Sequence, residues 1–142
     1  MVLFGSDHAG FSLKKELMLY LASRNISTKD FGCYSEESID YPDFAHPVAK
    51  KVLENPDFLG VLICGSGNGI NMTANKHLGI RSALCWKKEI AVLARQHNNA
   101  NILALPARFL SLEEAKEIVT VFLETDFEGG RHQARINKIS IL

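Results

Sequence analysis

Hydrophobic positions along the chain form two kinds of pattern, short continuous runs and longer stretches with helical spacing. The short runs, which predict strands, cover residues 2–6, 27–31, 61–63, 81–85 and 102–105. The longer stretches, which predict helices, cover residues 11–25, 41–54, 88–96 and 112–123, with a short helix or turn over residues 70–76. Strands that alternate with helices indicate a parallel sheet covered on both faces. The pattern therefore predicts an α/β fold of Rossmann-like type, with three αβα layers and a five-stranded parallel sheet.

Single residues indicate where some of these elements begin and which way they face. Ser111 and Glu114 have the spacing of a capping box, which predicts the start of the last long helix. Pro47 is expected in the first turn of its helix, where an N–H group has no partner within the helix. The first helix has an apolar stripe opposite Lys14 and Lys15, which predicts a solvent-facing side for both lysines.

The composition is typical of one globular domain that covers residues 1–142. Hydrophobic residues make up 46% of the chain and charged residues 23%. Sixteen basic and sixteen acidic residues cancel, so a surface for nucleic acid or acidic membranes is not expected. The chain opens on a strand-like run, and the apolar residues 17–22 are too few to span a bilayer. We therefore expect a cytoplasmic protein.

The three cysteines do not form a recognisable framework. Cys33, Cys64 and Cys85 are odd in number and lack CxxC spacing, which argues against both disulfide pairing and a structural zinc site. Cys33 and Cys85 are expected to be small packing residues. Cys64 differs from them because it stands directly before a glycine-rich loop.

That loop is the strongest chemical signal in the chain. A buried strand ends at Cys64 and passes into Gly65, Ser66, Gly67, Asn68 and Gly69, after which a short helix or turn is expected. Backbone N–H groups at such a helix start attract negative charge. The GxGxG spacing fits neither a dinucleotide fingerprint nor a Walker loop, and a tight turn without a ligand is the plain alternative. A nearby electropositive helix start would favour a Cys64 thiolate at the mouth of a glycine-lined hollow.

Other polar residues also follow predicted strands. Asp7 and His8 follow the first strand, and Arg108 follows the last. Ligands of such sheets bind at the carboxyl ends of the strands, so these side chains are candidates for a shared site. A loop cap or a solvated charge would explain each of them alone. The pattern does not fix the positions of the loop residues Tyr41, His97 and Asn98, and it leaves His46 and His77 structural and His132 undecided.

The C-terminal segment carries a local positive charge. Arg131 and Arg135 are four residues apart and would share one face of a helix, and Lys138 follows them without any acidic residue after Glu128. A solvated basic terminus is one interpretation. The other is an anion clamp, because guanidinium groups donate hydrogen bonds in a rigid fork. A phosphorylated small molecule is the simplest anion for so concentrated a charge.

Taken together and in order, these motifs resemble those of a known family. They are Ser6-Asp7-His8-Ala9-Gly10-Phe11, Tyr41-Pro42-Asp43, the loop from Cys64 to Gly69, Ala74-Asn75-Lys76, Arg81-Ser82-Ala83, His97-Asn98, Gly129-Gly130-Arg131-His132 and Arg135. Nearly the whole chain is similar to the type B ribose-5-phosphate isomerases, a family that includes galactose-6-phosphate isomerases. The resemblance implies aldose–ketose interconversion of ribose 5-phosphate and ribulose 5-phosphate without a metal or cofactor.

The resemblance also implies roles for individual residues. Cys64 matches the base that moves a proton between C1 and C2. Ile70 stands where some members have a glutamate base, which favours the cysteine. The other catalytic matches are Ser66, which orients the sugar, and His97 with Asp7, which open the furanose ring. The substrate-binding matches are Asp7, His8, Tyr41, Gly65, Ser66, Gly67, Asn68, Gly69, Asn98, Arg108, Arg131 and Arg135.

Two expectations about the arrangement follow. Helix-dipole reasoning alone puts the phosphate on the glycine loop, whereas the resemblance puts the reacting carbons there and the phosphate among the arginines. The resemblance also implies a homodimer, with pairing of dimers left open, in which each site draws residues from both chains. Gly129 and Gly130 would then let the tail, residues 126–142, reach the partner. The alternatives are a hexose-6-phosphate isomerase and a nucleotide-binding module without catalysis.

Overall fold

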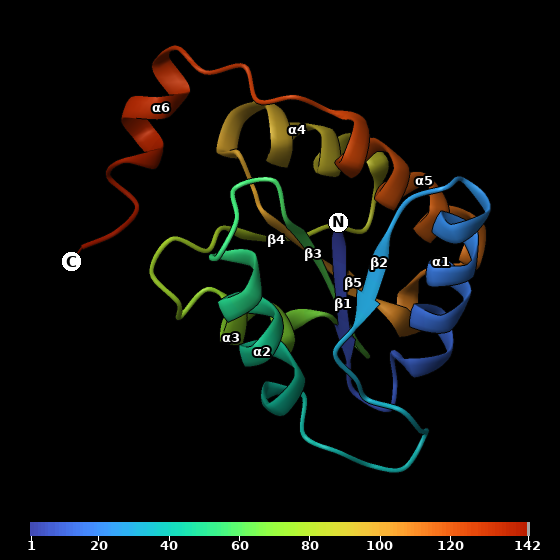
Figure 1. The fold of residues 1–142 in the computed structure, drawn as a ribbon. Helices are drawn as coiled ribbons and strands as arrows, with labels where there is room; N and C mark the ends of the chain where they lie inside the picture. Colours follow the sequence, from blue (N-terminus) through green and yellow to red (C-terminus); the bar gives the residue numbers. More distant parts are fainter. Residues whose placement is uncertain (142) are drawn as a thin grey trace.

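One parallel sheet forms the centre of the molecule. The computed structural model describes residues 1–141. Its strands are β1 (Val2–Ser6), β2 (Thr28–Asp30), β3 (Leu59–Cys64), β4 (Ser82–Leu84) and β5 (Ile102–Pro106). They lie in the order β2-β1-β3-β5-β4, and every pairing is parallel (Figure 1). The predicted five-stranded parallel sheet is confirmed.

Helices cover both faces of this sheet. They are α1 (Phe11–Ser23), α2 (Pro42–Val52), α3 (Asn68–Ala74), α4 (Lys88–Asn98), α5 (Leu112–Glu124) and α6 (Arg131–Ile136), with a 3₁₀ turn over Ala107–Phe109. Helices α1, α4 and α5 pack on one face, and α2 and α3 pack on the other. The three-layer prediction is therefore confirmed. Within residues 1–141, none of these helices has the length and apolar character that a membrane crossing requires.

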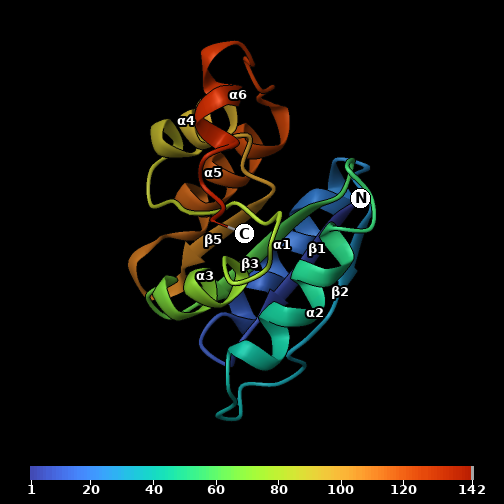
Figure 2. The same cartoon turned by 90° about the vertical axis from the view of Figure 1, so that its left-hand side faces the viewer.

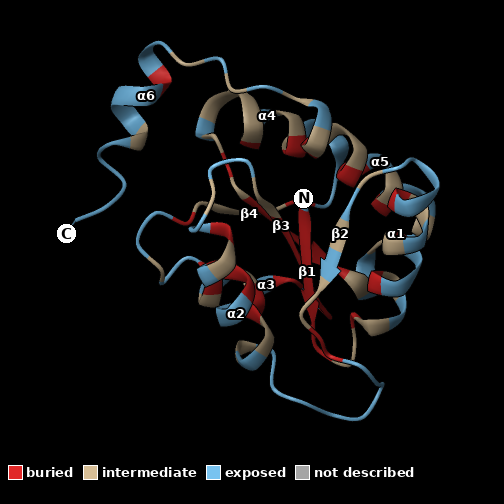
Figure 3. Cartoon of the chain, in the orientation of Figure 1, coloured by how far each residue is buried: buried red, intermediate tan, exposed pale blue. Residues whose placement is uncertain are grey.

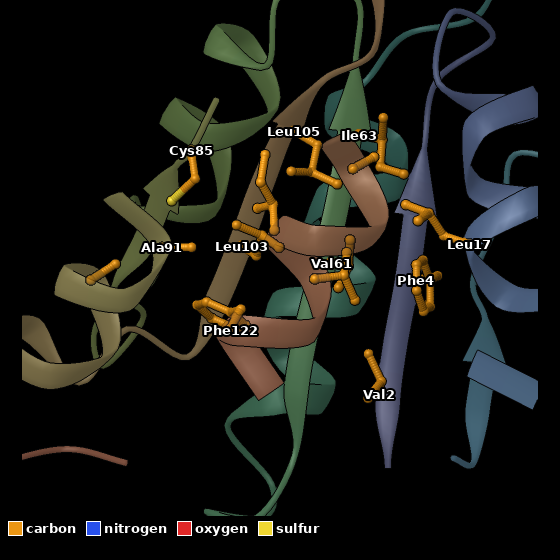
Figure 4. Packing of buried hydrophobic residues seen from close by; sticks show 14 of the residues in the cluster. Val2, Phe4, Leu17, Val61, Ile63, Cys85, Ala91, Leu103, Leu105 and Phe122 are labelled. Carbon is orange, nitrogen blue, oxygen red and sulfur yellow. The ribbon is translucent and has the colours of Figure 1, made fainter. Parts of the chain in front are cut away.

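The core consists of two apolar layers separated by the sheet. Val61 and Ile63 point toward α1 and α5, whereas Leu62 and Cys64 point toward α2 and α3. Figure 3 shows the central strands as buried, and Figure 4 shows Val61 and Ile63 beside Leu103, Leu105 and Phe122. Burial of each such side chain contributes about 2 kcal/mol to stability. A strand that is apolar on both faces is therefore held in the middle of the sheet, and its carboxyl end is fixed.

Lys14 does not face solvent as its position in α1 predicts. Its side chain is fully buried, and its ammonium group donates to Oδ1 of Asp30 at 2.7 Å and to the carbonyl oxygen of Cys33. Asp30 lies in the edge strand β2, and its negative charge offsets the cost of burying the Lys14 ammonium group. The spacing of apolar residues in one helix shows only that Lys14 is polar. It cannot predict a contact with Asp30, which lies 16 positions further along the chain.

Pro47 also departs from its predicted place. Helix α2 starts at Pro42, whose fixed φ suits a first helical position. Pro47 consequently lies inside the helix, beyond its first turn. The residue is exposed, so the backbone hydrogen bond that a proline cannot make is lost on the solvent side. Two prolines five positions apart cannot both occupy the first turn, and Pro42 takes that place.

Candidate functional site

Three strand ends bring polar groups to the carboxyl edge of the sheet. Strands β1, β3 and β5 are neighbours, and Asp7, Cys64 and Arg108 lie at or just after their ends. The N–H group of Asp7 donates to the carbonyl oxygen of Ile63 at 3.2 Å, and that of Arg108 donates to the carbonyl oxygen of Gly65 at 3.0 Å. The expectation that these residues share one edge is confirmed. We call this group, with the glycine loop, the carboxyl-edge cluster.

The glycine loop is closely covered by two side chains from elsewhere in the chain. A Cβ atom at Gly65 would lie 3.0 Å from Nη1 of Arg108, and one at Gly69 would lie 2.4 Å from Cζ of Tyr41. The guanidinium group and the phenol ring therefore lie directly on the loop backbone. This contact settles the position of Tyr41, which the sequence pattern left open, and adds it to the carboxyl-edge cluster.

The loop itself is held in a turn that opens α3. Gly67, with φ +76°, is the residue that precedes the helix, and this left-handed conformation favours glycine. The hydroxyl oxygen of Ser66 accepts from the N–H group of Asn68 at 3.3 Å. Ser66 and Asn68 are both exposed, so their polar groups can reach a ligand above the loop.

Cys64 is less open than the sequence suggests. The residue is only 4% exposed and packs in the apolar layer that contains Leu3 and Ile70. The expectation of a thiol open to a hollow is therefore wrong for the isolated chain, because β3 is buried on both faces and Cys64 points into the layer covered by α2 and α3. Cys85 is buried more completely, and burial raises the pKa of its thiol to about 12.

The two residues after β1 connect the neighbouring loops. Oδ1 of Asp7 accepts from the N–H group of Gly10 at 3.1 Å. Nδ1 of His8 accepts from the N–H group of Ile39 at 3.1 Å, which ties the exposed loop before α2 to this edge. Asp7 is nearly buried, at 6% exposure, whereas His8 is partly exposed. His8 is therefore the more accessible of the two candidates.

The remaining candidates lie at the opposite edge of the sheet. Helix α4 follows the carboxyl end of β4 and returns to the start of β5, so His97 and Asn98 lie near the amino ends of the strands. Figure 2 shows α6 beside α4 and apart from α3. A strand as long as β3 spans about 17–20 Å. Cys64 and the α6 residues Arg131 and Arg135 are therefore too far apart to share one cavity within a single chain.

The second group surrounds a pocket of its own, which we call the α4–α6 pocket. It has a volume of about 300 Å³ and is lined by His97, Asn98, His132, Arg135, Ile136 and Ile139. Arg131 and Arg135 do lie on a helix, α6, as their spacing suggests. The rings of His97 and His132 are stacked, with centroids 4.3 Å apart.

Burial and neighbouring charges disfavour a protonated His132 in this pocket. Burial, the neighbouring His97 and the guanidinium group of Arg131 lower the pKa of His132, whereas Glu128 opposes the shift. Nε2 of His97 lies 3.5 Å from Oε1 of Glu128. Among residues 1–141, His97, Glu128 and His132 form the one group of three side chains that could hold a metal ion.

Glu128 and His132 were not assigned to the site from the sequence. Their separation of four residues is the only available signal, and it means little without a helix that contains both. Arg81 was also missed as a supporting residue. Its guanidinium group donates to the carbonyl oxygens of Asn98 and Asn99, at 3.0 and 2.9 Å, and holds the end of α4.

Comparisons with known proteins agree on one family. The model of the Ribose/Galactose Isomerase family matches residues 2–139. The chain is 44% identical to ribose-5-phosphate isomerase B of Escherichia coli, over 99% of this chain and 95% of that protein. It is 48% identical to a probable ribose-5-phosphate isomerase B of Mycoplasma genitalium, over 97% of this chain and 92% of that protein.

Solved structures give the same result. The crystal structure of a ribose 5-phosphate isomerase from Thermotoga maritima has a TM-score of 0.96 and 49% identity, over 99% of this chain and 97% of that one. The Mycoplasma genitalium ribose-5-phosphate isomerase B with bound ribulose-5-phosphate has a TM-score of 0.93 and 48% identity, over 97% of this chain and 92% of that one.

Proposed function

The chain belongs to the ribose/galactose isomerase family, and from this premise we propose that it interconverts ribose 5-phosphate and ribulose 5-phosphate as an aldose–ketose isomerase. One observation carries the proposal, the near full-length similarity to a structure that contains bound ribulose-5-phosphate. Such a reaction belongs to the non-oxidative pentose phosphate pathway. No metal or cofactor takes part in the proposed chemistry.

Cys64 is the proposed base. Its thiolate removes the proton from C2 of the open-chain aldose, the electron pair forms a C1–C2 double bond, and the electrons of the C1 carbonyl move to O1. A proton passes from the C2 hydroxyl to O1, and the thiol returns its proton to C1 as the C2 carbonyl forms. Negative charge develops on the sugar oxygen in the enediolate. The N–H groups of residues 65–69 would stabilise that charge, with Ser66 orienting the sugar. Ile70, an apolar residue, leaves the cysteine as the nearest candidate base in this segment.

His97 is the proposed group that opens the furanose ring. An imidazole can give a proton to the ring oxygen and take one from the C1 hydroxyl near neutral pH. Asp7 would assist from the carboxyl-edge cluster. Asn98, which follows His97 in the same pocket, would donate to a sugar hydroxyl.

The proposed phosphate site is the positive side of the α4–α6 pocket. Arg135 lines that pocket and Arg131 lies one helical turn away. Two guanidinium groups can hold a phosphate by paired, charge-assisted hydrogen bonds. His8, Tyr41 and Arg108 would contact the sugar from the carboxyl-edge cluster, with the backbone of Gly65, Gly67, Asn68 and Gly69.

A homodimer would bring the two groups together. Cys64 and His97 lie at opposite edges of one sheet, so one sugar cannot reach both within one chain. In a twofold dimer the carboxyl-edge cluster of each chain can face the α4–α6 pocket of the other, which produces two equal sites. Gly129 and Gly130, with φ of +71° and +59°, would be the joint that lets the tail of this single domain reach the partner.

A turnover assay tests the proposed function. Purified protein should convert ribose 5-phosphate to ribulose 5-phosphate, and turnover of hexose 6-phosphates serves as the comparison for the galactose branch of the family. Faster turnover of a hexose 6-phosphate would move the assignment to that branch. Binding of nucleotides without turnover of either sugar phosphate would instead support a non-catalytic module.

A further inference from the structure

The connection between α5 and α6 brings three metal-binding side chains to one point. His97 lies in the last turn of α4, Glu128 lies in the connection, and His132 lies in the first turn of α6. Nε2 of His97 lies 3.5 Å from Oε1 of Glu128, and Nε2 of His132 lies 3.8 Å from the same oxygen. One ligand atom from each side chain lies within 4.8 Å of the other two. Two imidazole nitrogens and a carboxylate oxygen are a common zinc ligand set.

Two of the three spacings are close to what a zinc ion requires, whereas the stacked rings of His97 and His132 must turn before both lone pairs can face one ion. Bonds from zinc to nitrogen or oxygen are about 2.0–2.2 Å long, so tetrahedral ligand atoms lie about 3.3–3.5 Å apart. The two measured distances differ from this by a few tenths of an ångström at most. The side chains of His97 and Glu128 are 41% and 50% exposed, so both can turn inward. The fourth ligand position would be left to water.

The backbone around the three side chains is already held in place. The N–H group of Glu128 donates to the carbonyl oxygen of Gln96 at 3.1 Å, and that of His132 donates to the carbonyl oxygen of Gly129 at 3.2 Å. The connection is thereby fixed to the end of α4. An ion that binds here would not have to order these segments first, which lowers the cost of binding.

Local charge sets the expected strength of binding. The carboxyl end of α4 favours a cation, and Glu128 supplies one negative charge. Arg131 and Arg135 lie on the same helix as His132, and their positive charges oppose binding of a cation. The affinity should therefore be weaker than that of a structural zinc site, and the ion should be removable by a chelator.

We propose that His97, Glu128 and His132 bind a zinc ion and that the bound ion inhibits the enzyme. The ion takes the Nε2 lone pair of His97, so this imidazole can no longer exchange a proton with the sugar ring. Zinc is an inhibitor here and not a cofactor of the reaction. Binding of the ion is independent of the proposed function, whereas the inhibition rests on it.

A second histidine pair provides a matched control. Nδ1 of His46 in α2 lies 2.7 Å from Nε2 of His77, which follows α3. These two histidines lack a third metal-binding side chain among residues 1–141. A metal bound by any close histidine pair would lose affinity in His77→Gln, whereas a metal bound at the proposed site would not.

The binding test uses cobalt as a visible substitute for zinc. Co²⁺ is titrated into the full-length protein and into the Glu128→Gln and His77→Gln variants, and the absorption bands of the bound ion are followed. The wild type and His77→Gln should bind one zinc-displaceable Co²⁺ per chain, and Glu128→Gln should bind at least about tenfold more weakly. Equal affinity in Glu128→Gln, loss of binding in His77→Gln, or thiolate-to-cobalt absorption would overturn the site.

The inhibition test compares turnover with and without the ion. Zinc at the concentration that saturates the site should lower ribose 5-phosphate turnover at least about tenfold, because protonation by a positioned group contributes a factor of that size or more. A chelator should restore the activity, and Glu128→Gln should resist the same zinc concentration. Full wild-type turnover at saturating zinc contradicts the inhibition. A wild type that binds Co²⁺ yet never isomerises the sugar supports the metal site and refutes the proposed function.

Discussion

Cys64 ends β3 and Cys85 directly follows β4, two strands that β5 separates, but only Cys64 adjoins the glycine loop. We predict that Cys64→Ala lowers ribose 5-phosphate turnover by about a thousandfold, the scale of a lost general base, while sugar phosphate affinity changes little. Cys85→Ala should keep turnover, because burial raises the pKa of the Cys85 thiol to about 12 and leaves it protonated. Steady-state assays and direct binding of ribose 5-phosphate measure both effects. Retained turnover in Cys64→Ala would exclude the thiol as the base.

Replacing Gly67 or Gly129 with alanine would distinguish the cost of backbone strain from the cost of a steric clash. Both have left-handed φ, +76° and +71°, and an alanine there costs about 1–2 kcal/mol in backbone strain. A Cβ at Gly67 would also lie 2.4 Å from Cδ1 of Leu84, whereas one at Gly129 would meet no described atom within 4 Å. Urea unfolding should therefore show that Gly67→Ala loses about 1–3 kcal/mol more than Gly129→Ala. Equal losses would mean that the loop relaxes away from β4.

Helix α6 provides a matched pair of cations. Arg135 lines the α4–α6 pocket, and Lys138 follows the helix without lining that pocket. We predict that Arg135→Ala raises the KM for ribose 5-phosphate by about tenfold or more, because a hydrogen bond to a charged group is worth about 1.5–3 kcal/mol. Lys138→Ala should leave KM nearly unchanged. An unchanged KM in Arg135→Ala would remove that residue from the phosphate site.

The contact between α2 and the turn after α3 should respond to acid. Burial, followed by His46 and Lys50, lowers the pKa of His77 below its ordinary value of 6.5. The unfolded chain therefore binds this proton first, so the stability present at neutral pH is lost as the pH falls below that value. Urea unfolding between about pH 7 and pH 5 should show a smaller loss of stability in His77→Gln than in the wild type. An unaltered slope would show that His77 does not contribute to it.

At the scale of elements, the sequence predicts what depends on local spacing and misses what depends on distant partners. The capping box at Ser111 and Glu114 is present as predicted, because both partners lie within one turn. The burial of Lys14 could not be predicted, since its partner Asp30 lies in another element. The position of Tyr41 on Gly69 is missed for the same reason. Its loop connects β2 to α2 and carries no periodic pattern.

At the scale of the whole molecule, alternation along the chain predicts the sheet, and the strand-end rule predicts the carboxyl-edge cluster. The same rule does not predict the position of His97, because this residue lies at the end of α4. That helix begins at the carboxyl edge of the sheet and ends at the amino edge. Helix α6 then packs on α4 and places Arg135 beside His97. In the proposed dimer a second chain would complete this site, and a single sequence does not describe such a contact.

Subunit complementation tests this central claim most directly. Cys64→Ala and His97→Asn should each be inactive alone, since each lacks one half of every site. After the two variants are unfolded and refolded together, half of the dimers should be mixed, and each mixed dimer should contain one intact site. We predict recovery of about a quarter of the ribose 5-phosphate turnover of wild-type protein refolded in the same way. A refolded mixture that contains mixed dimers yet stays as inactive as its parents would contradict it.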